Sequence, residues 1–524
     1  MQRARSVPWN TVTIATLGLA LTGAWVMGVL TLTLSRGYET SAPFVLVPIF
    51  IAVSLPALRA QARREASSTL LWLLVAALVL KLASAFVREY VAFGVYGGAA
   101  DAANYHAEGV RISEAFRDGN FTTGLHSLTS TNYIRFFTGV VYTVIGASRL
   151  GGFLFYSWLG FWGLFLFYRA ATVALPEGGP RTYATLVFFL PSLLFWPSSI
   201  GKEAWMLFAL GIAAYGAALI LSRATLRGLA YAGSGLWLAA IVRPHVAGMM
   251  AIALAVGYLL RRPKEELRQL APIAKALSLA ILTVVALFLV VRTERFIEEA
   301  GIDTTGGVTS VIEGVTERTA SGGSEFTPSP VLGSPLSAPV GIVTVLFRPF
   351  PFEATNAQGL AVALEGTFLL VLTILRIRWA WGAFRSARRQ PYVAFAVVYS
   401  ALFAVGFSGV ANFGLLSRER VQLLPLYLVL FSIPPRRGTE IDADARDERD
   451  AAPLTPHGRG VDEPGPATSP AGTSLRDRPS DEGSRELEAT VRELEETLQR
   501  IEARIEGPAS GSVSERNDRD RPAP

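Results

Sequence analysis

Long apolar runs recur along this chain from its start to about residue 434, and they constrain its fold more than any other feature of the sequence. An α-helix of roughly 17–25 apolar residues is long enough to cross the hydrocarbon core of a bilayer. By this criterion the chain offers spans near 10–34, 42–58, 67–92, 150–168, 183–199, 204–221, 228–242, 246–260, 273–291, 357–375, 392–409 and 420–434. The sequence therefore predicts an all-α polytopic integral membrane protein with about twelve transmembrane helices.

The composition agrees with this fold class and excludes several kinds of chemistry. Hydrophobic residues make up 51% of the 524 residues and charged residues only 17%, a balance that is unusual for a water-soluble globule. The chain has no cysteine, so disulfides, thiolate metal sites and cysteine nucleophiles are excluded. The sequence contains no Walker, HExxH or GxSxG motif, which leaves ATPase, zinc protease and serine hydrolase activities without support.

The distribution of charge predicts how the chain is oriented. The net charge of +6 comes largely from arginines in short segments between the apolar runs, so the positive-inside rule explains it and nucleic-acid binding is not expected. The first run, Thr11 to Leu34, is too long for a signal peptide. We expect a multi-pass membrane protein with both termini cytoplasmic. Two long extracytoplasmic loops follow from this topology, at 93–149 and 292–356, and the Gly-, Ser-, Thr- and Pro-rich part of the second is expected to be mobile.

This topology requires that two short apolar stretches do not cross the membrane. Phe136 to Ile145 is only about ten residues long and is predicted to be interfacial or re-entrant, beside an amphipathic stretch at Ile112 to Phe116. Pro339 to Phe350 is interrupted by proline and is predicted to dip into the outer face.

The end of the chain has a different character. Residues 437–483 are rich in charged residues, Gly, Pro and Ser, so we expect a disordered linker, and 507–524 a disordered tail. Within 484–506, apolar residues recur at spacings of four and three, as in an a/d heptad stripe: Leu487, Val491, Leu494, Leu498, Ile501 and Ile505. This segment is predicted to be an amphipathic or coiled-coil helix that self-associates, docks on a partner or remains single.

The run Asp-Ala-Ala-Asn-Tyr-His, residues 101–106, opens the first long polar segment. Asp101 is a candidate general base for an acceptor hydroxyl, and the alternative is that it caps the helix that follows. Tyr105 and Glu108 lie one and two helical turns further on, and His106 and Glu108 are weaker catalytic candidates.

Several cations lie at the ends of spans, where an ionisable residue is a functional candidate. Lys202 and Glu203 open a helix after the prolines at 191 and 197, which are expected to break the preceding one. Arg243 is held by Pro244 and suits a phosphate, whereas His245 is a proton carrier or a structural histidine.

For two later segments, the sequence likewise allows either a ligand-binding role or a structural role. Arg348 either holds a phosphate or pairs with Glu353 to fasten its own segment. Arg418 and Arg420 lie on an outward-facing loop, against the positive-inside trend, and either bind phosphate or pair with Glu419; Asn412 lies just before them.

Taken together, residues 65 to 435 resemble the GT-C superfamily of membrane glycosyltransferases, in particular bacterial members related to the protein mannosyltransferases and the lipid A aminoarabinose transferases. The resemblance rests on layout: an early acid on the first large loop, broken helices with Pro-Ser…Phe-Trp…Gly-Lys-Glu, a later Arg-Pro, and Asn-Phe-Gly…Arg-Glu-Arg before the last span. It implies a GT-C-like transmembrane domain over 1–436, a polyprenyl-phosphate-linked sugar donor and transfer outside the membrane.

By this resemblance Asp101 matches the family's first-loop carboxylate, and Lys202, Arg243 and Arg348 correspond in kind to its phosphate-binding groups. Asp101 lacks the adjacent acid that GT-C first loops often carry; the resemblance allows a divalent cation at the site, and no other cofactor is expected. Two additional spans precede the loop, which keeps an O-antigen or exopolysaccharide polymerase open as an alternative. A transporter or flippase for a lipid-linked substrate, and a scaffold that acts through its C-terminal helix, are the alternatives of other classes.

Overall fold

The computed structural model describes residues 9–432, except 99, 177, 224–225, 262–270, 300, 303–306, 321–322, 333 and 388. All of the described residues belong to one compact unit, Met1–Arg446. The linker, helix and tail predicted for 437–524 lie outside the described residues. The described residues are helical almost throughout. They contain no β-strand, only an isolated bridge between Glu325 and Asn412. The predicted all-α fold is confirmed.

The first three helices are long and apolar. They are α1 (Trp9–Arg36), α2 (Tyr38–Arg64) and α3 (Ser68–Glu89), and α3 continues into the π-helix η1 (Tyr90–Val95). Ser67 caps α3 by accepting a hydrogen bond from the Leu70 amide. No residue in the apolar window of α1 is buried. An apolar helix with no protein cover is suited to a lipid environment.

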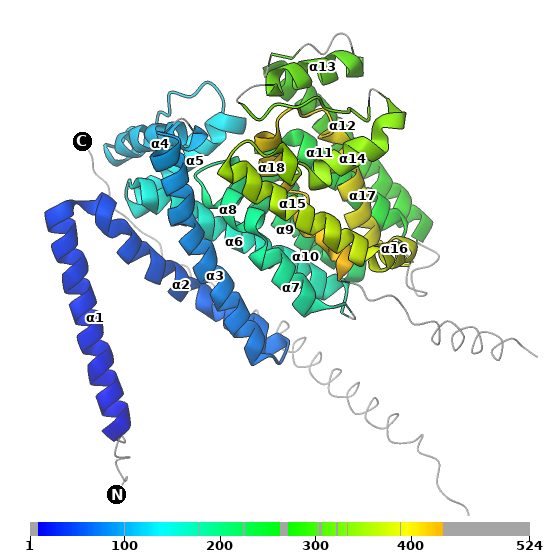
Figure 1. Ribbon diagram of the computed structural model, residues 1–524. Coiled ribbons are helices and arrows are strands. Elements are labelled where there is room, and N and C mark those ends of the chain that lie inside the picture. The colour runs from blue at the N-terminus through cyan, green and yellow to red at the C-terminus, as the bar shows by residue number, and fades with distance from the viewer. Residues whose placement is uncertain are drawn as a thin grey trace, which may run out of the picture. The chain divides into compact units, whose positions relative to one another are not determined.

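The first predicted extracytoplasmic loop is two helices packed against each other, α4 (Asp101–Arg117) and α5 (Ser130–Ile145) (Figure 1). Gly109 and Gly139 allow the close approach, because a Cβ at Gly139 would lie 2.4 Å from the Ile112 side chain. The predicted interfacial stretch at 136–145 forms the C-terminal part of one 16-residue helix, α5. The predicted amphipathic neighbour at 112–116 lies within α4.

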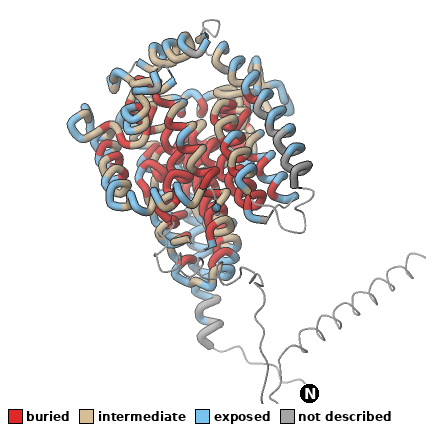
Figure 2. Tube along the Cα trace, turned by 90° about the vertical axis from the view of Figure 1, so that its right-hand side faces the viewer, coloured by how far each residue is buried: buried red, intermediate tan, exposed pale blue. Residues whose placement is uncertain are grey.

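The buried centre of this unit is formed by α6 (Arg149–Ala174), α9 (Lys202–Arg223), α10 (Leu226–Val242), α11 (Pro244–Leu259) and α17 (Pro391–Gly406). Figure 2 shows buried residues concentrated in the middle of the helical body, with exposed residues around them. Small residues bring α6 and α9 together: a Cβ at Gly211 would lie 2.5 Å from the Gly163 carbonyl oxygen. Close packing on small residues is typical of membrane helix pairs.

The predicted span at 183–199 is not a single helix. It consists of α7 (Pro180–Phe189), the short α8 (Pro191–Phe195) and the 3₁₀-helix η2 (Trp196–Ser198). Pro191 and Pro197 cause the breaks, since proline removes a backbone donor and clashes with the preceding turn. Lys81, fully buried on α3, donates hydrogen bonds to the carbonyls of Leu193 and Leu194 at 2.7 and 2.8 Å and holds the broken segment in place.

The second half of the unit begins with α12 (Ala271–Glu299) and α13 (Gly307–Thr319). The 292–356 segment was predicted to be one long loop, yet it also contains α13, η4 (Pro335–Ser337), α14 (Ala338–Phe347) and η5 (Pro351–Glu353). It is attached to the core, since Phe326 N donates to Ala411 O at 3.0 Å and Phe413 N to Ser324 O at 2.9 Å. The segment at 339–350, which was predicted to enter the outer face of the membrane without crossing it, consists largely of α14, and this helix ends before Pro349.

The remaining helices are α15 (Ala357–Leu375), α16 (Ile377–Ser386), α18 (Phe413–Arg420), α19 (Leu424–Tyr427) and η6 (Leu428–Phe431). The predicted span at 420–434 is thus a series of short turns up to residue 431. Six described helices are long and apolar enough to cross a membrane: Thr16–Arg36, Tyr38–Arg64, Ser68–Val95, Arg149–Ala174, Lys202–Ser222 and Ala357–Leu375. Four shorter apolar helices, 226–242, 244–259, 338–347 and 391–406, accompany them. The chain is a helical membrane protein, with half of the predicted spans recovered by this criterion.

Candidate functional site

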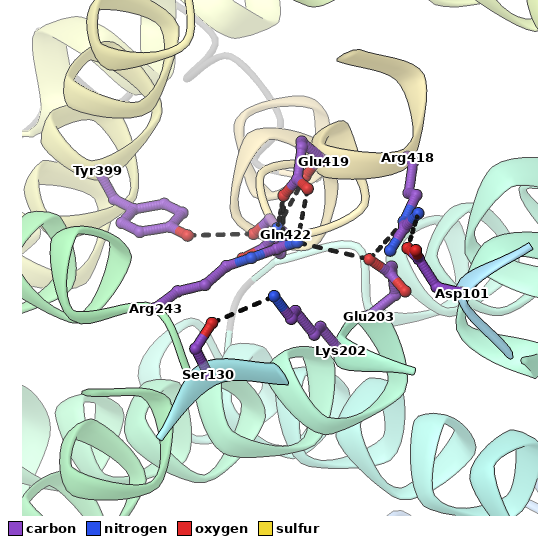
Figure 3. A network of polar contacts seen from close by, with 9 residues as sticks. All are labelled: Asp101, Ser130, Lys202, Glu203, Arg243, Tyr399, Arg418, Glu419 and Gln422. Atoms are coloured by element: carbon purple, nitrogen blue, oxygen red, sulfur yellow. Dashed lines mark hydrogen bonds and ion pairs between the residues drawn. The ribbon is translucent and has the colours of Figure 1, made fainter. Parts of the chain in front are cut away.

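Four helix ends that are distant in the sequence meet at one place. They are the starts of α4 at Asp101, of α9 at Lys202 and of α11 directly after Arg243, and the last turn of α18 at Arg418 and Glu419. Figure 3 shows side chains from all four ends directed toward one another. Charged groups at helix ends can satisfy free backbone groups and the helix dipole, which explains why this part of an apolar fold tolerates them.

A turn that contains two glycines positions Asp101 at this site. Gly97 and Gly98 follow the π-helix with φ angles of 59° and 83°, a region that residues with a Cβ rarely adopt. The chain then enters α4, and Asp101 occupies its first turn. The alternative role as helix cap is not seen, because Ala100 is the cap residue and no side chain caps α4. The Asp101 side chain remains 60% exposed and accessible to a ligand.

Arg418 joins Asp101 to Glu203. Its Nη1 donates to Asp101 Oδ2 at 2.9 Å and its Nε donates to Glu203 Oε1 at 2.6 Å. Among the described residues, nothing donates to the second oxygen of Asp101, Oδ1. One face of the carboxylate is thus held while the other is open.

Arg243 continues the network on the buried side. Both of its terminal nitrogens donate to the Glu419 carboxylate, Nη2 at 2.5 Å, and Nη2 also lies 3.5 Å from Glu203 Oε1. Gln422 Nε2 donates to Glu419 Oε2 at 2.6 Å. Arg243, Glu203 and Glu419 are all buried, and paired guanidinium and carboxylate groups are the form in which charges tolerate burial.

The network alternates in charge, with Asp101, Glu203 and Glu419 negative and Arg418 and Arg243 positive. Burial would lower the pKa of Arg418, but the carboxylates of Glu203 and Asp101 outweigh burial and raise this pKa above its ordinary value. Tyr105, next to the network, has its pKa raised to about 12 by burial and by the same two carboxylates. Arg418 therefore stays charged and Tyr105 stays neutral at physiological pH.

Lys202 lies beside the network without joining it (Figure 3). Its Nζ donates to Ser130 Oγ at 3.2 Å, a contact between α9 and the start of α5. No carboxylate within the described part of the chain forms an ion pair with it. Lys202 is therefore a cation whose charge no direct partner neutralises.

A polar cavity of about 180 Å³ lies next to Asp101, and its walls include Arg88, Ser199, Glu203 and Arg418. Arg88 comes from the last turn of α3 and is 9% exposed. Its guanidinium carbon lies 5.0 Å from the Phe195 ring centre and 5.2 Å from that of Trp196. No acceptor for its hydrogen-bond donors occurs among the described residues, and its Nε is buried. A buried guanidinium held only by aromatic rings, at the wall of a polar cavity, is suited to an anionic ligand.

Comparisons with known proteins do not assign this site. No protein-family model matches the chain. No curated protein and no solved structure is significantly similar to it. The candidate function therefore rests on the residues themselves.

Other predicted site residues lie outside the network. Arg348 pairs with Glu353, its guanidinium carbon is 5.0 Å from both the Phe326 and Phe413 rings, and nothing in the described chain links it to Asp101. The capping oxygen of Asn412 accepts from Leu415 N at 2.9 Å and so starts α18. These contacts fasten the second long segment to α18, the structural alternative that the sequence left open for Arg348.

The remaining candidates serve local contacts. Glu108 pairs with Arg111 at 2.9 Å on the exposed side of α4, and His106 Nδ1 lies 2.8 Å from Tyr142 Oη. Arg420, predicted to bind substrate, is fully buried and donates to the backbone carbonyls of Val345 and Arg348. His245 is half-buried, with its ring centre 5.9 Å from that of Phe407.

One predicted pairing is wrong, and one residue is missing from the sequence-based set. Arg418 and Arg420 do not pair with their neighbour Glu419, because successive helical residues point in different directions; Glu419 pairs with Arg243 instead. Arg88 was not selected, although a cation near the end of a predicted span is the signal that selected Lys202 and Arg243.

Within the described residues, no group of three or more His, Asp or Glu side chains is placed to hold a metal ion.

Proposed function

We propose that this protein is a membrane glycosyltransferase that moves a sugar from a polyprenyl-phosphate carrier to an acceptor hydroxyl outside the bacterial plasma membrane. One observation carries the proposal: the guanidinium of Arg88, which has no hydrogen-bond acceptor among the described residues, lines the same polar cavity as the carboxylate of Asp101, whose Oδ1 accepts no hydrogen bond from them. A lipid phosphate needs a cation, and an acceptor hydroxyl needs a base.

The proposed reaction is a single displacement at the anomeric carbon. Asp101 accepts the proton of the acceptor hydroxyl as the hydroxyl oxygen attacks that carbon. The bond between the carbon and the phosphate oxygen breaks, and its electron pair stays on the leaving phosphate. Arg88 stabilises the added negative charge, and one displacement inverts the anomeric configuration.

The ion-pair network has a positioning role in this proposal. Arg418 fixes the Oδ2 side of Asp101 and leaves Oδ1 for the acceptor. Glu203, Arg243 and Glu419 in turn fix Arg418, and their buried ion pairs leave Arg243 little freedom to bind phosphate itself. Lys202, which forms no ion pair with any described residue, supplies a second cation near the site.

A transporter has less support. The cation that the sequence places deepest in the membrane, Lys81, is held by two backbone carbonyls and so has little freedom to bind a transported anion. A polymerase acting on lipid-linked oligosaccharide would use the same groups. The length of the product distinguishes these two transferases, since a polymerase makes longer chains and a single transfer does not.

Replacement of Arg88 tests the phosphate site. Arg88→Gln should raise the KM for a polyprenyl-phosphate sugar about tenfold to a hundredfold, the effect of losing charge-assisted hydrogen bonds. Arg88→Lys, which keeps the charge, should recover part of this loss. Arg111→Gln, on the exposed side of α4, is the matched control and should match the wild type. An unchanged KM in Arg88→Gln, in a protein that is correctly inserted and folded, would contradict the assignment.

A further inference from the structure

A second and larger cavity, of about 580 Å³, lies between η1, α8 and α15. Figure 1 shows α3 and α15 on either side of α8. The walls are mainly apolar and include Val91, Val95, Phe195 and Val362. Sites for small organic ligands have volumes of roughly 300–1,000 Å³ and mostly apolar walls. This cavity therefore has the size and character of a ligand site.

The polar groups of the cavity occur at two levels. Asn356 and Gln358 lie at the start of α15, and Tyr96, directly after η1, donates from its Oη to Gln358 Oε1 at 2.7 Å. Glu365 lies seven residues further along α15, about 10 Å deeper at the helical rise per residue. The cavity thus has a polar rim, apolar walls and one carboxyl group at depth.

Glu365 is incompletely satisfied. It is 6% exposed, and its Oε2 accepts a hydrogen bond from the Ser192 amide at 2.6 Å. Its Oε1 is buried and has no hydrogen-bond partner among the described residues. A carboxyl oxygen without a partner is costly in apolar surroundings, so a polar ligand group is needed beside it.

We propose that this cavity binds a lipid-soluble alcohol whose hydroxyl group hydrogen-bonds to Glu365. The apolar walls fit a hydrocarbon body, but a plain hydrocarbon chain would leave Oε1 unsatisfied. A phosphate or carboxylate head would be repelled by an ionised Glu365. A hydroxyl both donates and accepts, so it satisfies the carboxyl group whether or not that group is protonated.

This site is distinct from the polar cavity at Asp101 but lies close to it. Phe195 and Trp196 line the apolar cavity, and the guanidinium of Arg88 lies over their rings while lining the polar one. The proposal does not depend on sugar transfer, because it rests on Glu365 and the cavity walls. Its test measures ligand binding alone.

Carbodiimide protection tests the proposal with the full-length protein in lipid nanodiscs. Dicyclohexylcarbodiimide is an apolar reagent that modifies carboxylic acids in apolar surroundings, and mass spectrometry locates its adduct. Glu365 should be modified, and Glu365→Gln should lose that adduct while Glu353→Gln keeps it. Saturating 1-decanol should slow modification of Glu365 about tenfold, whereas decane and decyl phosphate at the same membrane concentration should have little effect.

Two results would overturn the proposal. Equal protection by decane and 1-decanol would mean that the cavity accepts any apolar chain and that Glu365 does not select a hydroxyl. Absence of the adduct from wild-type Glu365 would mean that its carboxyl group does not face an accessible cavity. Neither result depends on the folding of a variant, since both are read from the wild-type protein.

Discussion

Asp101 Oδ2 accepts a hydrogen bond from Arg418 Nη1 at 2.9 Å, although 317 positions separate the two residues. The same guanidinium donates to Glu203, in the first turn of α9. The orientation of the exposed carboxylate on α4 therefore depends on α18, near the end of the described chain. A tertiary contact of this kind can hold a catalytic group more firmly than its own loop can.

The buried pair of Arg243 and Glu419 should make a large contribution to stability. Arg243→Met leaves Glu419 buried without its partner, so we expect a loss of roughly 3–5 kcal/mol in unfolding free energy. The double variant with Glu419→Leu should recover much of this loss, because it removes the orphaned charge. Chemical unfolding in detergent measures both. For comparison, loss of the exposed Glu108–Arg111 pair should cost less than about 1 kcal/mol. Equal losses in the single and double variants of the buried pair would contradict this account.

Arg348 should affect stability and not donor binding. Its guanidinium pairs with Glu353 and lies over two aromatic rings, so Arg348→Gln should lower the thermal unfolding temperature. The KM for a polyprenyl-phosphate sugar should remain within about twofold of wild type, because no phosphate contact is lost. A large rise in KM with normal thermal stability would restore Arg348 as a phosphate-binding residue.

His106 should make stability depend on pH. Burial lowers the pKa of its ring below the ordinary 6.5, with Arg149 acting in the same direction and Glu39 opposing. The unfolded chain therefore takes up a proton near pH 6.5, whereas the folded protein does so only at lower pH. The stability due to the neutral ring is complete above pH 6.5 and is lost as the pH falls from there toward the lowered pKa.

The comparison of His106→Gln with wild type isolates this effect. Thermal unfolding between about pH 5 and 8 should show a smaller loss at acid pH in the variant, since it lacks the titrating ring. His126→Gln, which replaces an exposed histidine in the same segment, serves as the control and should keep the wild-type profile. The account is wrong if His106→Gln loses as much stability at acid pH as the wild type does.

The sequence predicted the long helices well because their length and apolar character are local properties. The run at 42–58 falls within α2, the run at 67–92 extends from the cap residue of α3 into η1, and the run at 357–375 coincides with α15. Composition does not determine whether an apolar run forms a continuous helix. The run at 183–199 divides at Pro191, and its pieces are held by a lysine from α3 more than a hundred positions away.

For the candidate site, the sequence predicted the kinds of residue but not their partners. Charged residues at the ends of apolar spans are functional candidates, and this criterion selected Asp101, Glu203, Arg243 and Arg418. Ion pairs join these four residues in the structure. Arg243 could not be paired with Glu419 from the sequence, because that contact depends on the packing of α11 against α17 and the segment after it. The helix geometry that separates Arg418 from Glu419 could have been anticipated.

The most direct test of the account is Asp101→Asn, assayed for transfer of labelled sugar from a polyprenyl-phosphate donor in membranes with normal amounts of the protein. Asparagine keeps the shape of the side chain but cannot act as the base, so we expect transfer to fall about a hundredfold to ten-thousandfold with little change in donor affinity. Asp118→Asn, at the other end of α4, is the matched control and should transfer normally. Wild-type transfer by Asp101→Asn would contradict the account.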